Sequence, residues 1–129
     1  MEKKEQVKTF RDVIAWQKAH GLVLEIYIAT RDFPDTEKFS LVVQMRRAAV
    51  SVTSNIVEGF ARKMIKETLN FYNMANASLE ELKCQILICK DIKLISEQKY
   101  FELIKISSEV GRVLHAWTDS QRANSGLSR

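Results

Sequence analysis

The chain contains very few residues that interrupt helices. It has one proline, Pro34, and four glycines in 129 residues, whereas average usage gives roughly nine glycines and six prolines. Sheets and barrels need frequent turns rich in these two residues, but long helices do not. The length is that of one domain, and the 46% hydrophobic and 28% charged residues are typical of a soluble globular protein. We therefore expect a single all-α domain.

Apolar residues recur at steps of three and four, which predicts four amphipathic helices over about 10–30, 35–61, 65–92 and 96–117. Residues 1–9 are expected to be a flexible N-terminus and 118–129 a frayed polar tail. Long helices joined by short loops favour an antiparallel, up-down-up-down four-helix bundle over residues 10–117. The inward face of the first helix is expected to contain Trp16, Ala19, His20, Val23, Ile26, Tyr27 and Thr30.

The predicted helix ends have recognisable signals. Thr9 with Asp12 resembles a capping box, and Pro34 ends the first helix. Asp35 or Thr36 can cap the second helix, and Ser96 the fourth.

The second helix has three distinct faces when its residues are placed at 100° intervals. The core face contains Leu41, Met45, Ala48, Ala49, Val52, Ile56, Gly59 and Phe60. A polar stripe contains Gln44, Arg47, Ser51, Asn55, Glu58 and Arg62, and within it Glu58 can pair with Arg62 one turn later. Beyond this stripe, Val43, Val50 and Val57 form an apolar line at seven-residue spacing.

A lone four-helix bundle cannot cover two separate apolar faces of one helix. We therefore expect an interface between subunits, formed by the line Val43, Val50 and Val57 together with Arg47, Ser51, Asn55 and Glu58 of the stripe. The small residues of this helix predict close approach of a neighbouring backbone. Gly59 is the clearest case, because glycine costs a helix ~1 kcal/mol relative to alanine.

Several segments resemble one protein family. They are FRDVIAWQKA at 10–19, Phe33-Pro34, QMRRAAVSVTSNIVEG at 44–59 and ANASLEEL at 75–82. They are similar to the four-helix-bundle proteins encoded in intervening sequences of bacterial 23S ribosomal RNA genes. The resemblance implies a ring-shaped homopentamer of antiparallel bundles with a role in nucleic-acid binding. Related accessory proteins of diversity-generating retroelements partner a reverse transcriptase and RNA.

Residue patterns that support catalysis or metal binding are absent from the sequence. His20 and His115 are on different predicted helices and have no metal-binding spacing, and no Glu-x-x-His motif of the di-iron bundles occurs. Cys84 and Cys89 lie five residues apart, so they point to different faces and are expected to be reduced. The sequence has no glycine-rich phosphate loop and no nucleophile motif. We expect neither an enzyme nor a bound cofactor or metal.

The location is expected to be cytoplasmic and away from the membrane. No apolar run approaches the ~18 residues of a membrane span. The charged start of the chain has no apolar segment behind it, as a secretory signal would have.

The positive charge is concentrated in the first half of the chain. Residues 1–66 hold twelve Lys and Arg against eight Asp and Glu, whereas residues 67–129 hold eight of each. The residues expected to contact phosphates are Arg46, Arg47, Arg62, Lys63 and Lys66. No base-reading motif accompanies them, so binding to RNA or DNA would be independent of sequence. The alternatives are a purely structural or protein-binding oligomer, in which these cations pair with carboxylates, and an accessory subunit of a reverse transcriptase.

Overall fold

The computed structural model describes residues 6–126, and all regular structure in this range is helical. The elements are a short 3-10 helix, η1 (Phe10–Asp12), and five α-helices: α1 (Ile14–Thr30), α2 (Asp35–Lys38), α3 (Leu41–Ala61), α4 (Ile65–Asp91) and α5 (Glu97–Asn124). The predicted all-α class is confirmed. The predicted third helix and the Ser96 cap are confirmed as well, since the Ser96 side chain accepts a hydrogen bond from the Lys99 backbone N–H.

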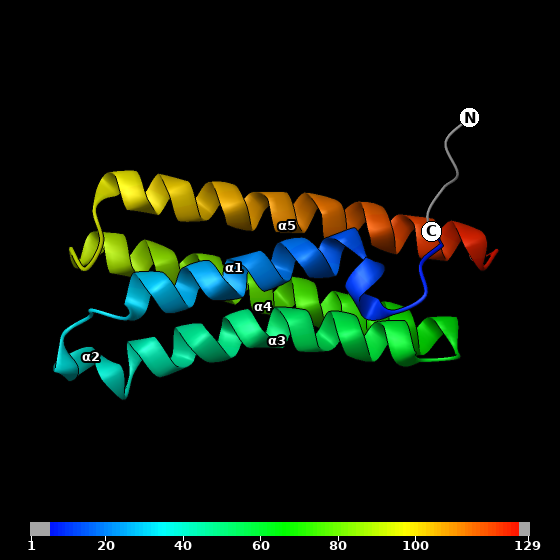
Figure 1. The fold of residues 1–129 in the computed structure, drawn as a ribbon, viewed down its shortest axis with the longest axis horizontal. Helices are drawn as coiled ribbons and strands as arrows, with labels where there is room; N and C mark the ends of the chain where they lie inside the picture. The colour runs from blue at the N-terminus through cyan, green and yellow to red at the C-terminus, as the bar shows by residue number, and fades with distance from the viewer. Residues whose placement is uncertain (1–5, 127–129) are drawn as a thin grey trace.

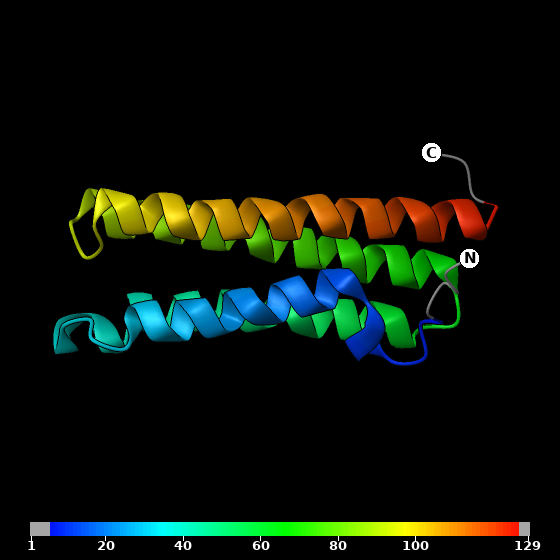
Figure 2. The same cartoon turned by 45° about the horizontal axis from the view of Figure 1, so that its top comes forward.

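The four long helices form a bundle in which each has two neighbours. Helix α3 packs against α1 and α4, and α5 packs against the same two helices, while the short α2 contacts only α3. The colour gradient in Figure 1 runs one way along α1 and α4 and the other way along α3 and α5. Figure 2 shows two layers, α1 with α3 and α4 with α5.

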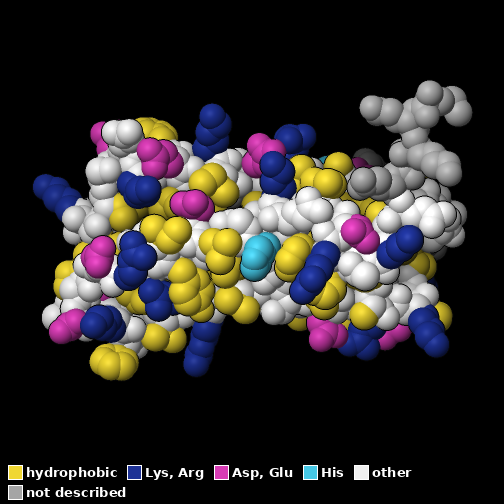
Figure 3. Space-filling model, in the orientation of Figure 1, with side chains coloured by type: hydrophobic (Ala, Val, Ile, Leu, Met, Phe, Trp, Pro, Cys, Tyr) yellow, Lys and Arg dark blue, Asp and Glu magenta, His cyan; other side chains and the backbone are white. Residues whose placement is uncertain are grey.

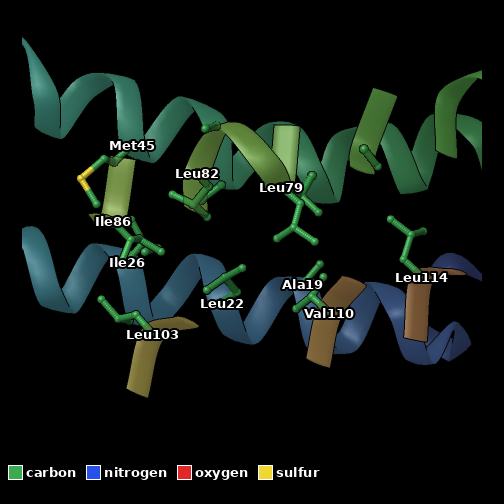
Figure 4. Packing of buried hydrophobic residues seen from close by; sticks show 14 of the residues in the cluster. Ala19, Leu22, Ile26, Met45, Leu79, Leu82, Ile86, Leu103, Val110 and Leu114 are labelled. Carbon is green, nitrogen blue, oxygen red and sulfur yellow. The ribbon is translucent and has the colours of Figure 1, made fainter. Parts of the chain in front are cut away.

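The core lies between these layers and is built from one stripe of each long helix. Figure 4 shows Leu22 and Ile26 of α1, Met45 of α3, Leu82 of α4 and Leu103 of α5 converging there. Helix α3 buries seven residues: Val42, Met45, Ala48, Ala49, Val52, Ile56 and Gly59. This set agrees closely with the core face predicted for it.

Gly59 allows α3 and α4 to approach closely, as predicted. A Cβ at this position would lie 2.6 Å from Cε1 of Tyr72 and 3.1 Å from the Thr68 carbonyl oxygen. The Tyr72 hydroxyl in turn accepts a hydrogen bond of 2.9 Å from the indole N–H of Trp117. This contact series links α3, α4 and α5 at one end of the bundle.

The first predicted helix differs from the structure in its start and in its buried face. The capping box of Thr9 and Asp12 is present, but it caps η1, and the extended, buried Val13 separates η1 from α1. Helix α1 buries Ala15, Ala19, Leu22, Ile26 and Thr30, whereas His20 and Tyr27 are exposed and Trp16 and Val23 half-buried. The periodicity was misleading because α1 is apolar on nearly every side, with only Lys18 and Glu25 charged.

The second predicted helix is interrupted at its start. Helix α2 ends at Lys38, and Phe39 and Ser40 leave the helical conformation before α3 begins at Leu41. Phe39 is 91% exposed, so no core contact holds this segment in line with α3. A short helical segment without packing is marginal, and neither proline nor glycine marks this break in the sequence.

The frayed tail predicted from residue 118 is wrong for residues 118–124, which continue α5. The Thr118 hydroxyl donates to the Leu114 carbonyl, and Arg122 pairs with Asp119. Residues 121, 124 and 125 help to line a hollow beside the α3–α4 turn, so the polar end of α5 packs on the bundle. The rest of the two predicted terminal segments, residues 1–5 and 127–129, lies outside the described residues.

Candidate functional site: the outer surface of α3

Arg46 is held against α1. Its Nε donates to the Thr30 hydroxyl at 3.1 Å, and its guanidinium carbon lies 4.4 Å from the centre of the Tyr27 ring. The guanidinium also donates to the Tyr27 carbonyl oxygen at 3.5 Å. Arg46 is therefore half-buried and engaged within its own chain.

Arg62 is also engaged within the chain. It forms the predicted ion pair with Glu58 at 2.8 Å and stacks on Phe71 of α4, 4.7 Å from the ring centre. Both charged side chains are exposed in the single chain. An exposed pair at this spacing contributes only about 0.3–0.5 kcal/mol to stability.

The other three predicted phosphate-binding residues are exposed and have no ion pair within residues 6–126. Lys63 and Lys66 lie at the turn between α3 and α4, whereas Arg47 lies near the other end of α3. The helical rise places Arg47 about 21 Å along the axis from Ala61, the last residue of α3, and Lys63 lies just beyond that end. The five cations therefore divide into two separate groups in one chain.

The polar stripe of α3 faces α4 at its centre. The Ser51 and Ser78 hydroxyls lie 2.8 Å apart, and the Asn55 amide donates to the Ser51 carbonyl oxygen at 2.9 Å. These half-buried groups satisfy one another within the chain. Their additional role in a subunit interface stays a prediction.

The valine line lies beside α1, outside the core. Tyr27, Val43 and Val50 line a shallow hollow between α1 and α3, together with Arg46, Arg47, Ser51 and Ser54. Val50 is 38% exposed and Tyr27 41% exposed, and Val57 is half-buried. Figure 3, viewed from the α1 side, shows hydrophobic side chains along α1 with Lys and Arg side chains around them. The apolar surface is thus shared by two helices.

Elsewhere in residues 6–126, a small ionic cluster lies near the end of α5. The His115 ring lies 3.2 Å from the Asp119 carboxylate, which also pairs with Arg122, beside a hollow that Asn73 and Asn76 help to line. Within the described part of the chain, no three His, Cys, Asp or Glu side chains are placed to hold a metal ion. Cys84 is exposed and Cys89 buried, and both are free thiols, as predicted.

Comparison with known proteins identifies the family. A sequence profile described as 23S rRNA-intervening sequence protein matches residues 11–116, which is most of the chain. The chain belongs to this family. The predicted resemblance is therefore confirmed.

A solved structure shares the fold of this intervening-sequence protein. It is the crystal structure of a protein of unknown function from the S23 ribosomal protein family of Bacteroides thetaiotaomicron. The two chains are 18% identical, with a TM-score of 0.72 over 81% of this chain and 97% of the other. No curated protein matches the chain. Over residues 6–126, the structure contains no helix that is both long and apolar enough to cross a membrane.

Sequence reasoning about this intervening-sequence protein missed Tyr27 as a surface residue. Tyr27 was assigned to the core, yet it holds Arg46 and lines the hollow beside the valine line. The available signal was the lack of charge around α1, which shows that its exposed side is apolar too.

Proposed function

We propose that this chain is a non-enzymatic protomer of a ring-shaped homo-oligomer that binds RNA weakly and without sequence preference. In this proposal each protomer is an up-down-up-down antiparallel bundle. The family resemblance suggests five protomers, and the apolar surface between α1 and α3 provides a contact for assembly. The name of the family connects it with ribosomal RNA genes.

The assembly part of the proposal is supported by the hollow between α1 and α3. Val50 and Tyr27 expose apolar surface there, and Val43 extends it along α3. Contact with another protomer would remove this surface from water, which stabilises an assembly by about 25 cal/mol per Å². Arg47 lies at the rim of the hollow, where interfaces tolerate charge.

The RNA-binding part rests on one observation, that Arg47, Lys63 and Lys66 form no ion pair within residues 6–126. Exposed cations without carboxylate partners can neutralise phosphates without breaking an ion pair. Three neutralised phosphates per protomer would give a log–log salt slope of about −2 for single-stranded RNA. Repetition around a ring would convert weak contacts into useful avidity. Phosphate contacts carry no base information, so the binding would be independent of sequence.

The test compares two triple variants that remove the same charge. The first replaces Arg47, Lys63 and Lys66 with glutamine. The control replaces Arg31, Lys93 and Lys105, which are also exposed and have no ion pair among the described residues. Fluorescence anisotropy with labelled single-stranded RNA at low and physiological salt should show a large loss of affinity only for the first variant. Equal losses, or no binding by the parent protein at low salt, would contradict the proposal.

A purely structural or protein-binding oligomer is the second candidate. It is favoured by the engagement of Arg46 and Arg62 within the chain, which leaves fewer cations for phosphates. This candidate predicts normal assembly together with no affinity for RNA in the same experiment.

A further inference from the structure

The outward face of α1 is an exposed apolar surface separate from the valine line of α3. Ile14 is 56% exposed, Leu24 50% and Ile28 51%. Only two residues of this helix are charged, Lys18 and Glu25. A helix that is apolar on nearly every side is normally covered on every side. The core and the contacts with α3 and α5 leave this face of α1 uncovered in the single chain.

Gly21 lies at the middle of this face, and nothing within residues 6–126 requires a glycine there. A Cβ at Gly21 would have no heavy atom within 4 Å outside its own helix turn and neighbours, and its φ is not in the left-handed region. Glycine weakens a helix interior relative to alanine. Ile14, Gly21 and Ile28 follow one another at seven-residue spacing, so they share one line along the helix. A glycine in such a line permits close approach of another backbone.

The charges beside Gly21 are arranged to complement a second copy of the same helix. Lys18 precedes Gly21 by three residues, and Glu25 follows it by four. In an antiparallel pair of α1 helices that cross at Gly21, Glu25 of one copy lies within one residue, about 1.5 Å along the axis, of the level of Lys18 of the other. Ile14 of each copy likewise lies level with Ile28 of the other. The surface is therefore self-complementary in both charge and apolar contact, as a two-fold contact requires.

The ion pairs within the chain are compatible with a contact between Lys18 of one copy and Glu25 of the other. Lys18 lies 3.6 Å from Glu109 of α5, and both side chains are about half exposed. Glu25 has no ion pair among residues 6–126. Lys18 can therefore interact with Glu25 of a second copy while it remains near Glu109.

We propose that two copies of the chain associate through α1, antiparallel and with their Gly21 residues in contact on a two-fold axis. This contact uses a different part of the surface from the α3 valine line, and neither contact depends on the other. If both form, a ring joined by two-fold contacts gives a closed assembly with dihedral symmetry.

Sedimentation of Gly21→Leu tests the contact, because a larger side chain at this open position leaves the protomer intact but separates the two helices. The experiment is done in a Val50→Asp background, where the proposed ring contact is removed. The Val50→Asp protein with Gly21 unchanged should form dimers. Gly21→Leu should raise the dimer dissociation constant roughly tenfold or more, with the helical circular dichroism signal unchanged. Ser108→Leu, at an exposed position of α5, is the matched control and should remain dimeric.

Disulfide formation provides a second, position-specific test in the full chain. Cys84 is exposed and is replaced by serine, and a new cysteine is introduced as Gly21→Cys or as Gln17→Cys. Residues on the two-fold axis meet their own counterparts, so Gly21→Cys should give a covalent dimer under mild oxidation. The two Gln17 positions would be about 12 Å apart along the axis, beyond the Cα separation that a disulfide allows. Absence of the Gly21→Cys dimer, or equal cross-linking at both positions, would overturn the α1 contact.

The measurements distinguish a failure of the α1 contact from a failure of the α3 ring contact. If Val50→Asp dissociates the protein to monomers and Gly21→Cys does not cross-link, the α1 contact is wrong and the α3 contact stands. A different protein or a lipid surface that covers α1 would give the same result for the purified chain, and would therefore also overturn this proposal.

Discussion

At the scale of single residues, Tyr72 and Gly59 determine how closely α3 and α4 pack. The Tyr72 ring occupies the space that a Cβ of residue 59 would need. Its hydroxyl receives the Trp117 indole hydrogen bond, so the ring cannot move away without losing that bond. The packing of three helices therefore depends on the absence of one methyl group.

Gly59→Ala should destabilise the protein even though alanine favours helices. The added Cβ would meet the Tyr72 ring and the Thr68 carbonyl oxygen at distances that require a shift of the backbone or ring. Overpacking of this kind costs about 1–3 kcal/mol, against a gain of up to ~1 kcal/mol in helix propensity. Urea denaturation at low protein concentration should show a net loss. Gly21→Ala, which has no such neighbour, is the control and should be neutral or stabilising.

The buried thiol of Cys89 should make the protein less stable in alkali. Burial, with a smaller effect of the Glu37 carboxylate, raises the pKa of Cys89 to about 11 from an ordinary value of 9.0. Between these values the unfolded chain loses the thiol proton and the folded chain keeps it, so the free energy of unfolding falls as pH rises. The full effect is at most about 2–3 kcal/mol. The fall in the free energy of unfolding between pH 8 and 11, measured by urea denaturation, should be smaller in Cys89→Ala and unchanged in Cys84→Ser.

Residue-level contacts were only partly predictable from the sequence. The Glu58–Arg62 pair follows from its spacing on one helix, and the structure confirms it. The Arg46–Tyr27 and Tyr72–Trp117 contacts join residues 19 and 45 positions apart on different helices. Such contacts depend on the lateral packing of helices, which periodicity within one helix does not determine.

At the scale of the elements, the helical class and the four long helices were predictable, but three boundaries and one buried face were not. Helices α3 and α4 have a clear apolar stripe, so their core residues follow from the sequence. Helix α1 has almost no polar side to mark its orientation. The break at Phe39 and Ser40 lacks a sequence signal because the residues there can continue a helix. The end of α5 is polar, yet its side chains pack beside the α3–α4 turn.

The outer face and the core face of α3 should respond differently to the same substitution. Val50 lies outside the core and is 38% exposed, whereas Val52 is fully buried. Val50→Asp should leave the helical signal intact and dissociate the proposed ring, because an unpaired carboxylate in a subunit interface costs several kcal/mol. Val52→Asp should unfold the chain itself. Circular dichroism and light scattering together distinguish these results, and a parent protein that is already a 14.9 kDa monomer would contradict the expected assembly.

At the scale of the whole molecule, the distribution of charge along the sequence does not predict which basic residues lie together on the surface. All excess positive charge lies in residues 1–66, and this suggested a single cluster. Arg46 and Arg62 attach α3 to its neighbours, whereas Arg47 lies about 21 Å along the helix axis from the end of α3 beside which Lys63 lies. A continuous basic surface would therefore require several protomers, so that the charges of one chain extend those of the next.

This requirement predicts that RNA affinity depends on assembly more than on any single charge. Val50→Asp retains Arg47, Lys63 and Lys66 but should separate the protomers. This variant, which no longer forms the ring and keeps at most two protomers joined through α1, should bind labelled single-stranded RNA at least about a hundredfold more weakly than the parent, because linked sites gain avidity that fewer sites lack. Its salt slope should also be shallower, since fewer phosphates are neutralised together. Anisotropy titrations of both proteins at three salt concentrations measure these two quantities. A dissociated variant that binds RNA as tightly as the parent would show that RNA binding does not require the ring.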